Sequence, residues 1–198
     1  MGGKKAQIHY LSCIIICHGK SEKEFMETIK QNLRLKVHIE SDKKGGKSIQ
    51  INSLNKTLNN HKYGKRDNFL RYFEDIELIK GKITPDFKIF TLLDTDDKEK
   101  EINLIKYLNK EMFKGHHLYN YIEPIYNTPK LENVFEEIGH VFKNKGDARK
   151  KEYKYLLKPY PTPELARNYL KELSGKFEKS KNTNLNQVIN FLLNINNN

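Results

Sequence analysis

Two apolar runs dominate the hydrophobic pattern of the chain, at residues 11–17 and 87–93. Both are rich in β-branched or other large apolar side chains, and neither shows the alternation of a half-exposed strand. Runs of this kind are typical of strands buried on both faces of a parallel sheet. Segments with helical apolar spacing follow each run. The pattern therefore predicts an α/β fold with a mostly parallel central sheet flanked by helices.

The segments between and after these runs predict the remaining elements. After the first run, Ser21 with Glu24 three residues later is typical of a capping box at a helix start. Alternation predicts a half-exposed strand at 35–40, and residues 119–126 predict a third core strand. Apolar stripes predict further helices with the following residues on their inner faces: Phe25, Ile29 and Leu33; Ile49, Leu54 and Leu58; Phe69, Leu70, Phe73, Ile76 and Ile79; Ile102, Ile105 and Leu108; Leu131, Phe135 and Ile138, after a cap at Thr128.

The 198-residue chain suits one large domain or a domain with an appendage. We expect residues 1–140 to form the α/β domain. Residues 141–198 are expected to form a basic helical extension packed on it, with closing helices near 163–174 and 183–194.

The formal net charge of +11 favours a polyanionic partner, nucleic acid first. A chain rich in Lys, Asn and Ile also gains positive charge from composition alone, as an AT-rich genome would encode. Between 143 and 158 the basic residues cluster with tyrosines, and Lys150, Lys151 and Lys154 are the candidate nucleic-acid contacts. The alternative interpretation is a solvated helical face whose tyrosines pack inward.

Cys13 and Cys17 lie on the same predicted strand, too far apart to form a disulfide. They are typical of small core residues in a reduced, intracellular protein. We find no stretch long and apolar enough for a signal peptide or a membrane span, so the sequence predicts a cytoplasmic protein without a membrane partner.

Residues that could form a functional site follow the two predicted buried strands. The first runs into His18, Gly19, Lys20 and Glu22, and the second into Asp94, Asp96 and Asp97. In open α/β sheets, sites form at the carboxyl ends of strands. Clustered carboxylates repel one another unless a cation lies among them, and hard oxygen ligands suit Mg²⁺ or Mn²⁺. The alternative is that Asp96 or Asp97 merely caps a following helix.

The glycine pair of residues 43–48 lies among lysines before a predicted helix. Such a segment can hold a phosphate through residues such as Lys47, although it lacks P-loop spacing. A flexible basic loop is the alternative interpretation.

The order of these motifs resembles that of TOPRIM domains, and is closest to the small TOPRIM proteins related to OLD-family nucleases and to RloB-type phage-defence proteins. In that pattern a strand ends in Glu-Gly with a following Thr/Ser-Glu, and a later strand ends in Asp-x-Asp. Here the first turn is His18-Gly19-Lys20-Ser21-Glu22, and Asp94-Thr95-Asp96 matches the second. The segment Thr128-Pro129-Lys130-Leu131-Glu132 resembles the Asn-Pro-x-x-Glu turn of RloB-type proteins, which adds Glu132 to the candidates.

The resemblance covers roughly residues 10–140 and implies a metal-dependent nuclease acting on DNA or RNA in phage defence. The metal ligands would come from Glu22, Asp94, Asp96 and Asp97, with Gly19 and Lys20 at the phosphate. His18 replaces the first glutamate of the family pattern, and as a metal ligand or general base it favours Mn²⁺ over Mg²⁺. One alternative is a TOPRIM-like domain that has lost catalysis and binds nucleic acid or a protein partner in a defence operon. Another is a phosphate-handling enzyme that acts on small nucleotides.

Overall fold

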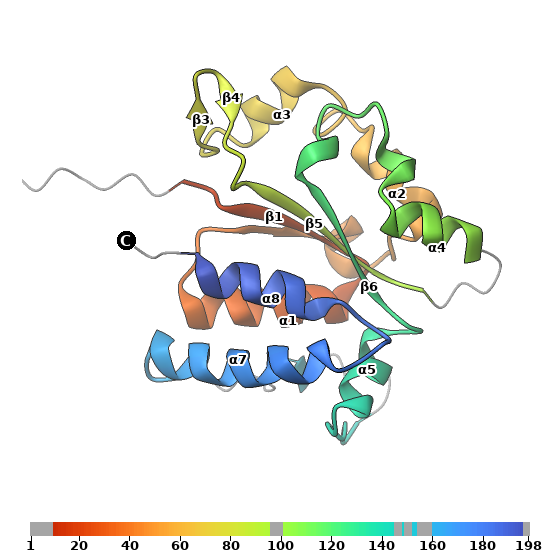
Figure 1. Ribbon diagram of the computed structural model, residues 1–198, viewed down its shortest axis with the longest axis vertical. Helices are drawn as coiled ribbons and strands as arrows, with labels where there is room; N and C mark the ends of the chain where they lie inside the picture. Colours follow the sequence, from red (N-terminus) through yellow and green to blue (C-terminus); the bar gives the residue numbers. More distant parts are fainter. Residues whose placement is uncertain (1–9, 96–100, 145–147, 149–151, 154–159, 196–198) are drawn as a thin grey trace, which may run out of the picture.

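The centre of the molecule is a parallel sheet. The computed structural model describes residues 10–95, 101–144, 148, 152–153 and 160–195. In the order of the sheet, the strands are β2 (His38–Glu40), β1 (Cys13–Cys17), β5 (Lys88–Asp94) and β6 (Ile122–Asn127). Each neighbouring pair is parallel, as Figure 1 shows. A short antiparallel hairpin, β3 (Leu78–Ile79) with β4 (Lys82–Ile83), projects from the end of the sheet at which β5 begins.

The two apolar runs form neighbouring strands, as the sequence predicts. Cys13 pairs with Lys88 and Cys17 pairs with Leu92, so β1 and β5 run side by side with their carboxyl ends together. Every residue of β1 is buried, and both cysteines are free thiols. Burial on both faces explains why β1 lacks polar alternation.

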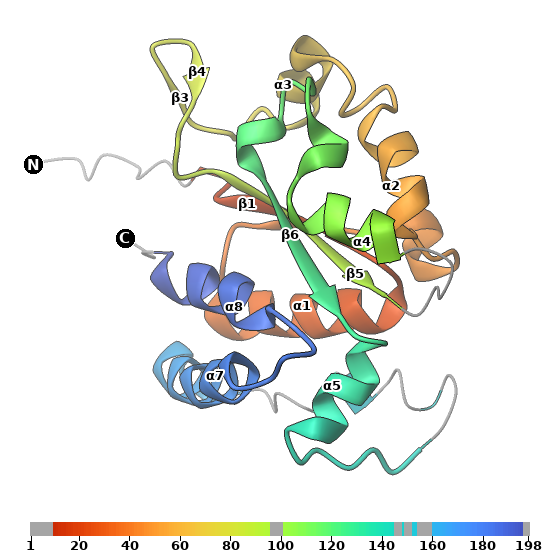
Figure 2. The same ribbon diagram turned by 45° about the vertical axis from the view of Figure 1, so that its right-hand side comes forward.

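Alternate residues of β1 point into two separate apolar cores. Cys13, Ile15 and Cys17 face the core shared with helices α1 (Lys20–Leu33), α5 (Leu131–Glu137), α7 (Pro163–Glu178) and α8 (Leu185–Asn194). Ile14 and Ile16 face the core shared with α2 (Ile51–Leu58), α3 (Arg66–Tyr72) and α4 (Glu101–Leu108). Figure 2 shows the two helical layers on opposite faces of the sheet.

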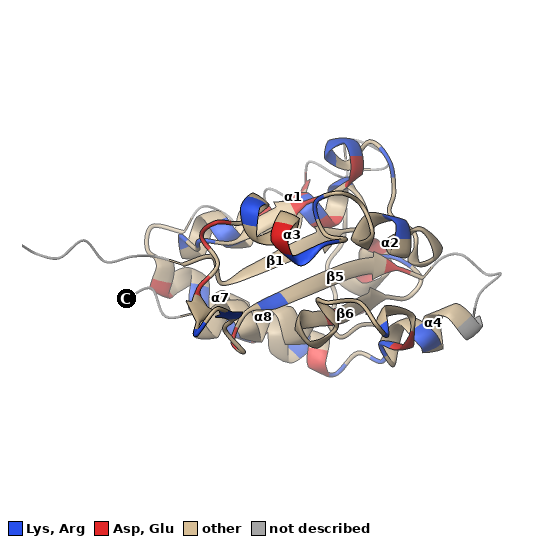
Figure 3. Cartoon of the chain, turned by 90° about the horizontal axis from the view of Figure 1, so that it is seen from above, with Lys and Arg blue, Asp and Glu red and all other residues tan. Residues whose placement is uncertain are grey.

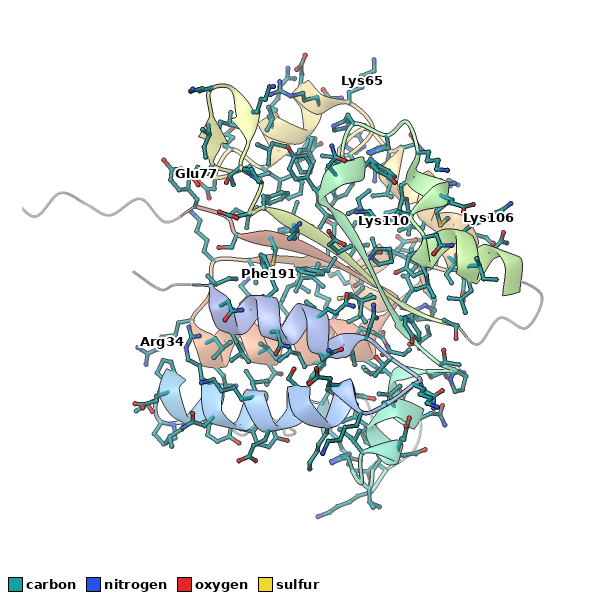
Figure 4. All side chains as sticks on the ribbon, viewed as in Figure 1. Arg34, Lys65, Glu77, Lys106, Lys110 and Phe191 are labelled. Atoms are coloured by element: carbon teal, nitrogen blue, oxygen red, sulfur yellow. The ribbon has the colours of Figure 1, made fainter. Side chains whose placement is uncertain are left out.

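The carboxyl-terminal helices belong to the first of these layers. The ring of Phe191 in α8, labelled in Figure 4, packs edge-on against Phe90 of β5 at a centroid distance of 5.1 Å. Leu170 of α7 is buried in the same core as Leu33 of α1. Helix α7 runs beyond the predicted end at residue 174 to Glu178, whereas α8 begins at Leu185, later than the predicted start at residue 183. Within the described residues, every helix is too short or too polar to span a bilayer.

Several predicted element boundaries were wrong. Helix α1 begins at Lys20 after the N-cap Gly19, rather than after Ser21. Helix α3 ends at Tyr72, and Ile79, predicted on its inner face, is instead half-exposed in the β3–β4 hairpin. In α4, Ile105 points into solvent with 58% of its surface exposed, because Tyr107 fills the core position. The N-cap of α5 is Lys130, not Thr128.

Three short 3-10 segments complete the described structure: η1 (Asp42–Gly45), η2 (Glu111–Phe113) and η3 (Tyr119–Tyr121). The predicted half-exposed strand at 35–40 is β2, which has only its central residue buried. Figure 3 shows that the charged residues lie mainly on helices and connecting segments, while the central strands carry few.

The outer edge of β6 is covered by the segment that precedes α8. The Tyr126 N–H donates to Oδ1 of Asn184 at 2.9 Å, and Nδ2 of Asn184 donates to the Pro124 carbonyl at 2.9 Å. Thr183 forms an antiparallel bridge with Asn127. The side-chain amide of Asn184 thereby occupies backbone groups that a further strand would otherwise pair with.

Candidate functional site

The carboxyl ends of β1 and β5 bring the two predicted turns to one edge of the sheet. The register that pairs Cys17 with Leu92 places the β1–α1 turn beside the end of β5. The His18 N–H continues this pairing by donating to the Leu92 carbonyl at 2.7 Å. The adjacency predicted from the two apolar runs is confirmed.

Glu22 lies in the first turn of α1 and is 2% exposed. Its Oε2 accepts a hydrogen bond from the Gly19 N–H at 2.9 Å, which satisfies a donor that the helix start leaves open. This carboxylate is close enough to Asp94 for its negative charge to raise the pKa of Asp94. The first-turn glutamate therefore caps the helix and also faces the end of β5.

Asp94 is the last residue of β5 and is 5% exposed. Its Oδ1 accepts two hydrogen bonds, from Nδ2 of Asn127 and from the Leu131 N–H, each at 3.2 Å. Burial raises the pKa of this carboxyl well above its usual value. The charges of Glu22 and Glu132 raise the pKa further, and the two hydrogen bonds only partly oppose them.

Glu132 lies in the first turn of α5 and is buried. The Ser21 hydroxyl donates to Oε1 of Glu132 at 3.1 Å, so the starts of α1 and α5 are joined directly. Ser21, predicted as a helix cap, is instead the link to this second acidic turn. The structure thus brings Glu132 into the same electrostatic environment as Glu22 and Asp94.

His18 and Lys20 occupy different surroundings at the β1–α1 turn. His18 is 8% exposed, and its carbonyl accepts a hydrogen bond from the Ile49 N–H at 2.8 Å. Lys20 is exposed on the first turn of α1. Lys47 is also exposed, in the segment that packs against that turn.

Five predicted site residues lie outside the described part of the chain: Asp96, Asp97, Lys150, Lys151 and Lys154. In the same basic segment, Tyr153 is fully buried and packs edge-on against Phe135 at a centroid distance of 5.6 Å. At this position, the tyrosine packs inward.

The donor chemistry of the site suits a hard divalent cation, because its carboxylates are buried and repel one another. Among the described residues, however, no three His, Cys, Asp or Glu side chains are grouped closely enough to hold a metal ion. Within the described residues, Glu22 and Asp94 alone therefore do not form a metal-binding group.

His116 and His117 are adjacent in sequence and anchor a loop on the face of the sheet that α2 covers. Nε2 of His116 bonds to the Leu58 carbonyl at 3.0 Å, and its Nδ1 accepts from the Leu118 N–H at 3.2 Å. Nε2 of His117 bonds to the Tyr63 carbonyl at 2.6 Å. Their ring nitrogens hold the segment against α2 and the residues that follow it.

Sequence reasoning missed Asn127 and Thr183. Asn127 is fully buried beside Asp94, and its Oδ1 accepts from the Thr183 hydroxyl at 3.0 Å. A signal for Asn127 was present, since it ends a third strand that reaches the same edge. Thr183 is distant in sequence and sits in a connection between helices, so local pattern carries no signal for it.

No protein-family model, no curated protein and no solved structure matches this chain. What the site does must therefore be inferred from its own geometry and chemistry.

Proposed function

We propose that this chain is a divalent-metal-dependent phosphodiesterase, a nuclease of TOPRIM-like architecture that cleaves DNA or RNA. The observation that carries the proposal is that Glu22 and Asp94 are both buried at one edge of a parallel sheet, where the charge of Glu22 raises the pKa of Asp94. Two buried carboxylates with mutual repulsion are stabilised by a divalent cation between them. The resemblance to RloB-type and OLD-related proteins supports the further proposal that this activity serves phage defence.

In this proposal Glu22, Asp94 and Asp96 hold Mg²⁺ or Mn²⁺, with Asp97 available to a second ion. The metal would activate water and neutralise charge on the scissile phosphate. His18 serves as a ligand or general base beside the metal, and Lys20 contacts the phosphate from the first turn of α1. The raised pKa of Asp94 supports this assignment, since binding a cation would remove the energetic cost of ionising a buried carboxyl.

A second candidate function is a nucleic-acid-binding domain that has lost catalysis. Two observations favour it. The Glu22 carboxylate is already engaged by the Gly19 N–H, and His18 occupies the position of the first glutamate in the family pattern. A protein partner in a defence operon would fit this reading as well as nucleic acid does.

Cleavage assays separate the two functions. Labelled single- and double-stranded DNA and RNA are incubated with Mg²⁺ and with Mn²⁺, using wild type, Asp94→Ala and His18→Glu. The nuclease proposal expects Mn²⁺-dependent products that Asp94→Ala abolishes and that His18→Glu retains with a shift towards Mg²⁺. A folded wild type that yields no metal-dependent product from any substrate rejects the nuclease and leaves the binding function.

A further inference from the structure

Residues 42–48, which we call the lysine loop, bring positive charge to the edge of the candidate site. Lys43, Lys44 and Lys47 of the loop are exposed, as is Lys20 beside them on α1. Within the described part of the chain, none of these four lysines forms an ion pair. Other lysines, such as Lys36 with Asp75 at 2.9 Å, are paired. The charge of the lysine loop is therefore available to a ligand.

The lysine loop is fixed against the first turn of α1. Gly45 has a φ of +87° and packs so tightly that an added Cβ would lie 2.8 Å from Cα of Lys20. Only glycine permits both this conformation and this approach. The same turn of α1 carries Glu22, so the packing fixes the loop backbone next to the candidate carboxylates.

The backbone of the loop holds two lysines in an unfavourable conformation. Lys43 and Lys44 have φ angles of 45° and 57°, in the left-handed region where glycine is preferred. Other described non-glycine residues with positive φ occupy ordinary turn positions: Arg34 ends α1, Lys80 lies in the β3–β4 turn, and Lys110 precedes η2. Consecutive lysines in this region are costly to stability, and strained positions cluster at ligand-binding sites.

A polyanion that approaches Glu22, Asp94 and Glu132 meets buried negative charge. Lysines beside the carboxylates offset that repulsion because they attract the phosphates. Each lysine that contacts a phosphate also favours binding by releasing a condensed counterion. We infer that the lysine loop, with Lys20, binds the phosphodiester backbone of a nucleic acid next to the carboxylates. The class of ligand rests on the proposed function, whereas the location of the binding surface rests on the loop itself.

The test removes charge without disturbing the fold. Lys43→Gly with Lys44→Gly replaces two lysines by the residue that their φ angles favour, so the double variant should melt at or above the wild-type temperature. The matched control is Lys80→Gly with Lys82→Gln, which removes the same charge from the β3–β4 hairpin at the other end of the sheet. It also includes a lysine with positive φ, since Lys80 has a φ of 50°.

Binding is measured by fluorescence anisotropy in EDTA, where no metal-dependent cleavage occurs, with labelled 20-nucleotide single-stranded DNA, duplex DNA and RNA of one sequence. We expect the loop variant to bind at least one probe about tenfold more weakly. Its plot of log affinity against log salt should be shallower by about 1.4 to 1.8, the value for two lost phosphate contacts. The control should stay within about twofold of wild type.

Equal losses in both variants, no loss in either, or no binding by wild type at low salt would each overturn the inference. Cleavage in Mn²⁺ is scored separately. A chain that binds through the loop but cleaves nothing rejects the nuclease and keeps the binding surface. A chain that cleaves, with an unaffected loop variant, rejects only the binding surface.

Discussion

The side-chain amide of Asn127 donates to the carboxylate of Asp94 across the last paired position of β5 and β6. Because Oδ1 of Asn127 accepts from the Thr183 hydroxyl, its Nδ2 must face Asp94. The single proton of the Thr183 hydroxyl is shared between Oδ1 of Asn127 and the Tyr126 carbonyl, which lies 2.8 Å from the hydroxyl oxygen. The connection between α7 and α8 thereby orients the hydrogen-bond partner of a candidate metal ligand.

Replacing Thr183 by Val should disturb the candidate site from a distance. The variant keeps the shape of the side chain but leaves Oδ1 of Asn127 without this donor, so Nδ2 is no longer directed at Asp94. We expect a loss of about 1–3 kcal/mol in the free energy of unfolding and weaker Mn²⁺ binding. Urea titration and isothermal calorimetry measure the two effects.

The control is Ser174→Ala, which removes a buried hydroxyl that bonds to Oδ1 of Asn190 at 2.7 Å between the same two helices. It should lower stability without changing Mn²⁺ binding. If both variants weaken metal binding equally, Thr183 acts only through general stability.

Asp94→Asn should change how stability depends on pH. The pKa of Asp94 is raised in the folded state, so the native state holds a proton more tightly than the unfolded chain does. Wild-type stability should therefore fall as pH rises from the usual aspartate value of 3.8 through the folded pKa, and the variant should lack this fall. At pH 8 without metal, we expect Asp94→Asn to be more stable than wild type.

The same variant tests metal binding. Mn²⁺ should raise the melting temperature of wild type, because a ligand that binds only the native state stabilises it, and should leave Asp94→Asn unchanged. The exposed Asp86→Asn serves as the control and should respond to Mn²⁺ as wild type does. A variant that is less stable at pH 8, or one that still responds to Mn²⁺, contradicts the assignment of Asp94.

Glu40, at the end of β2, should stabilise the fold in a defined pH window. Burial alone would raise its pKa, but hydrogen bonds from His38, Lys62 and Tyr63 outweigh it and lower the pKa from 4.5 to about 2. This stabilisation is complete above pH 4.5 and is lost as pH falls towards 2. The difference corresponds to about 3 kcal/mol.

Urea titrations at several pH values between 2 and 7 test this. Glu40→Gln should be less stable than wild type at pH 7, and the gap should narrow below pH 4.5. The exposed Glu74→Gln should show no such gap. A constant gap across the whole range would show that Glu40 contributes through packing rather than charge.

Gly45→Ala should detach the lysine loop from α1. The added methyl group would overlap the Lys20 backbone, whereas at Gly81, which also has a positive φ of +74°, an added Cβ meets nothing within 4 Å. A left-handed backbone destabilises both alanine variants by about 1–2 kcal/mol, and only Gly45→Ala is destabilised further by the overlap. Chemical denaturation should therefore rank Gly45→Ala below Gly81→Ala, and equal stabilities would refute the close packing.

The core strands could be predicted because their sequence signal is local. β1 and β5 are buried on both faces, so each shows a run dominated by apolar residues whatever lies beside it. The helix boundaries failed where a tertiary contact competed with the local rule. Ser21 is a good N-cap residue, yet its hydroxyl bonds to Glu132 on another helix. Ile105 fits the helical stripe, yet Tyr107 fills the core because its hydroxyl reaches the Ile125 carbonyl at 3.0 Å.

In the candidate site, too, the residues with a local sequence signal could be predicted and those set by tertiary contacts could not. Glu22 and Asp94 were found because each follows a recognisable strand, and the rule for parallel sheets brings strand ends together. The network around Glu40 joins side chains from β2 and from the segment after α2, and no periodicity in the sequence marks it. Contacts of this kind depend on how loops close over the sheet, which single-sequence patterns do not encode.

The covered edge of β6 also affects whether two molecules of this protein can associate through strand pairing. A strand from a neighbouring molecule could add to β6 only after breaking the two hydrogen bonds that Asn184 makes with the backbone at Tyr126 and Pro124. Pro124 itself offers no N–H to an incoming strand. The segment that orients Asn127 therefore also discourages cross-β association along this edge of the sheet.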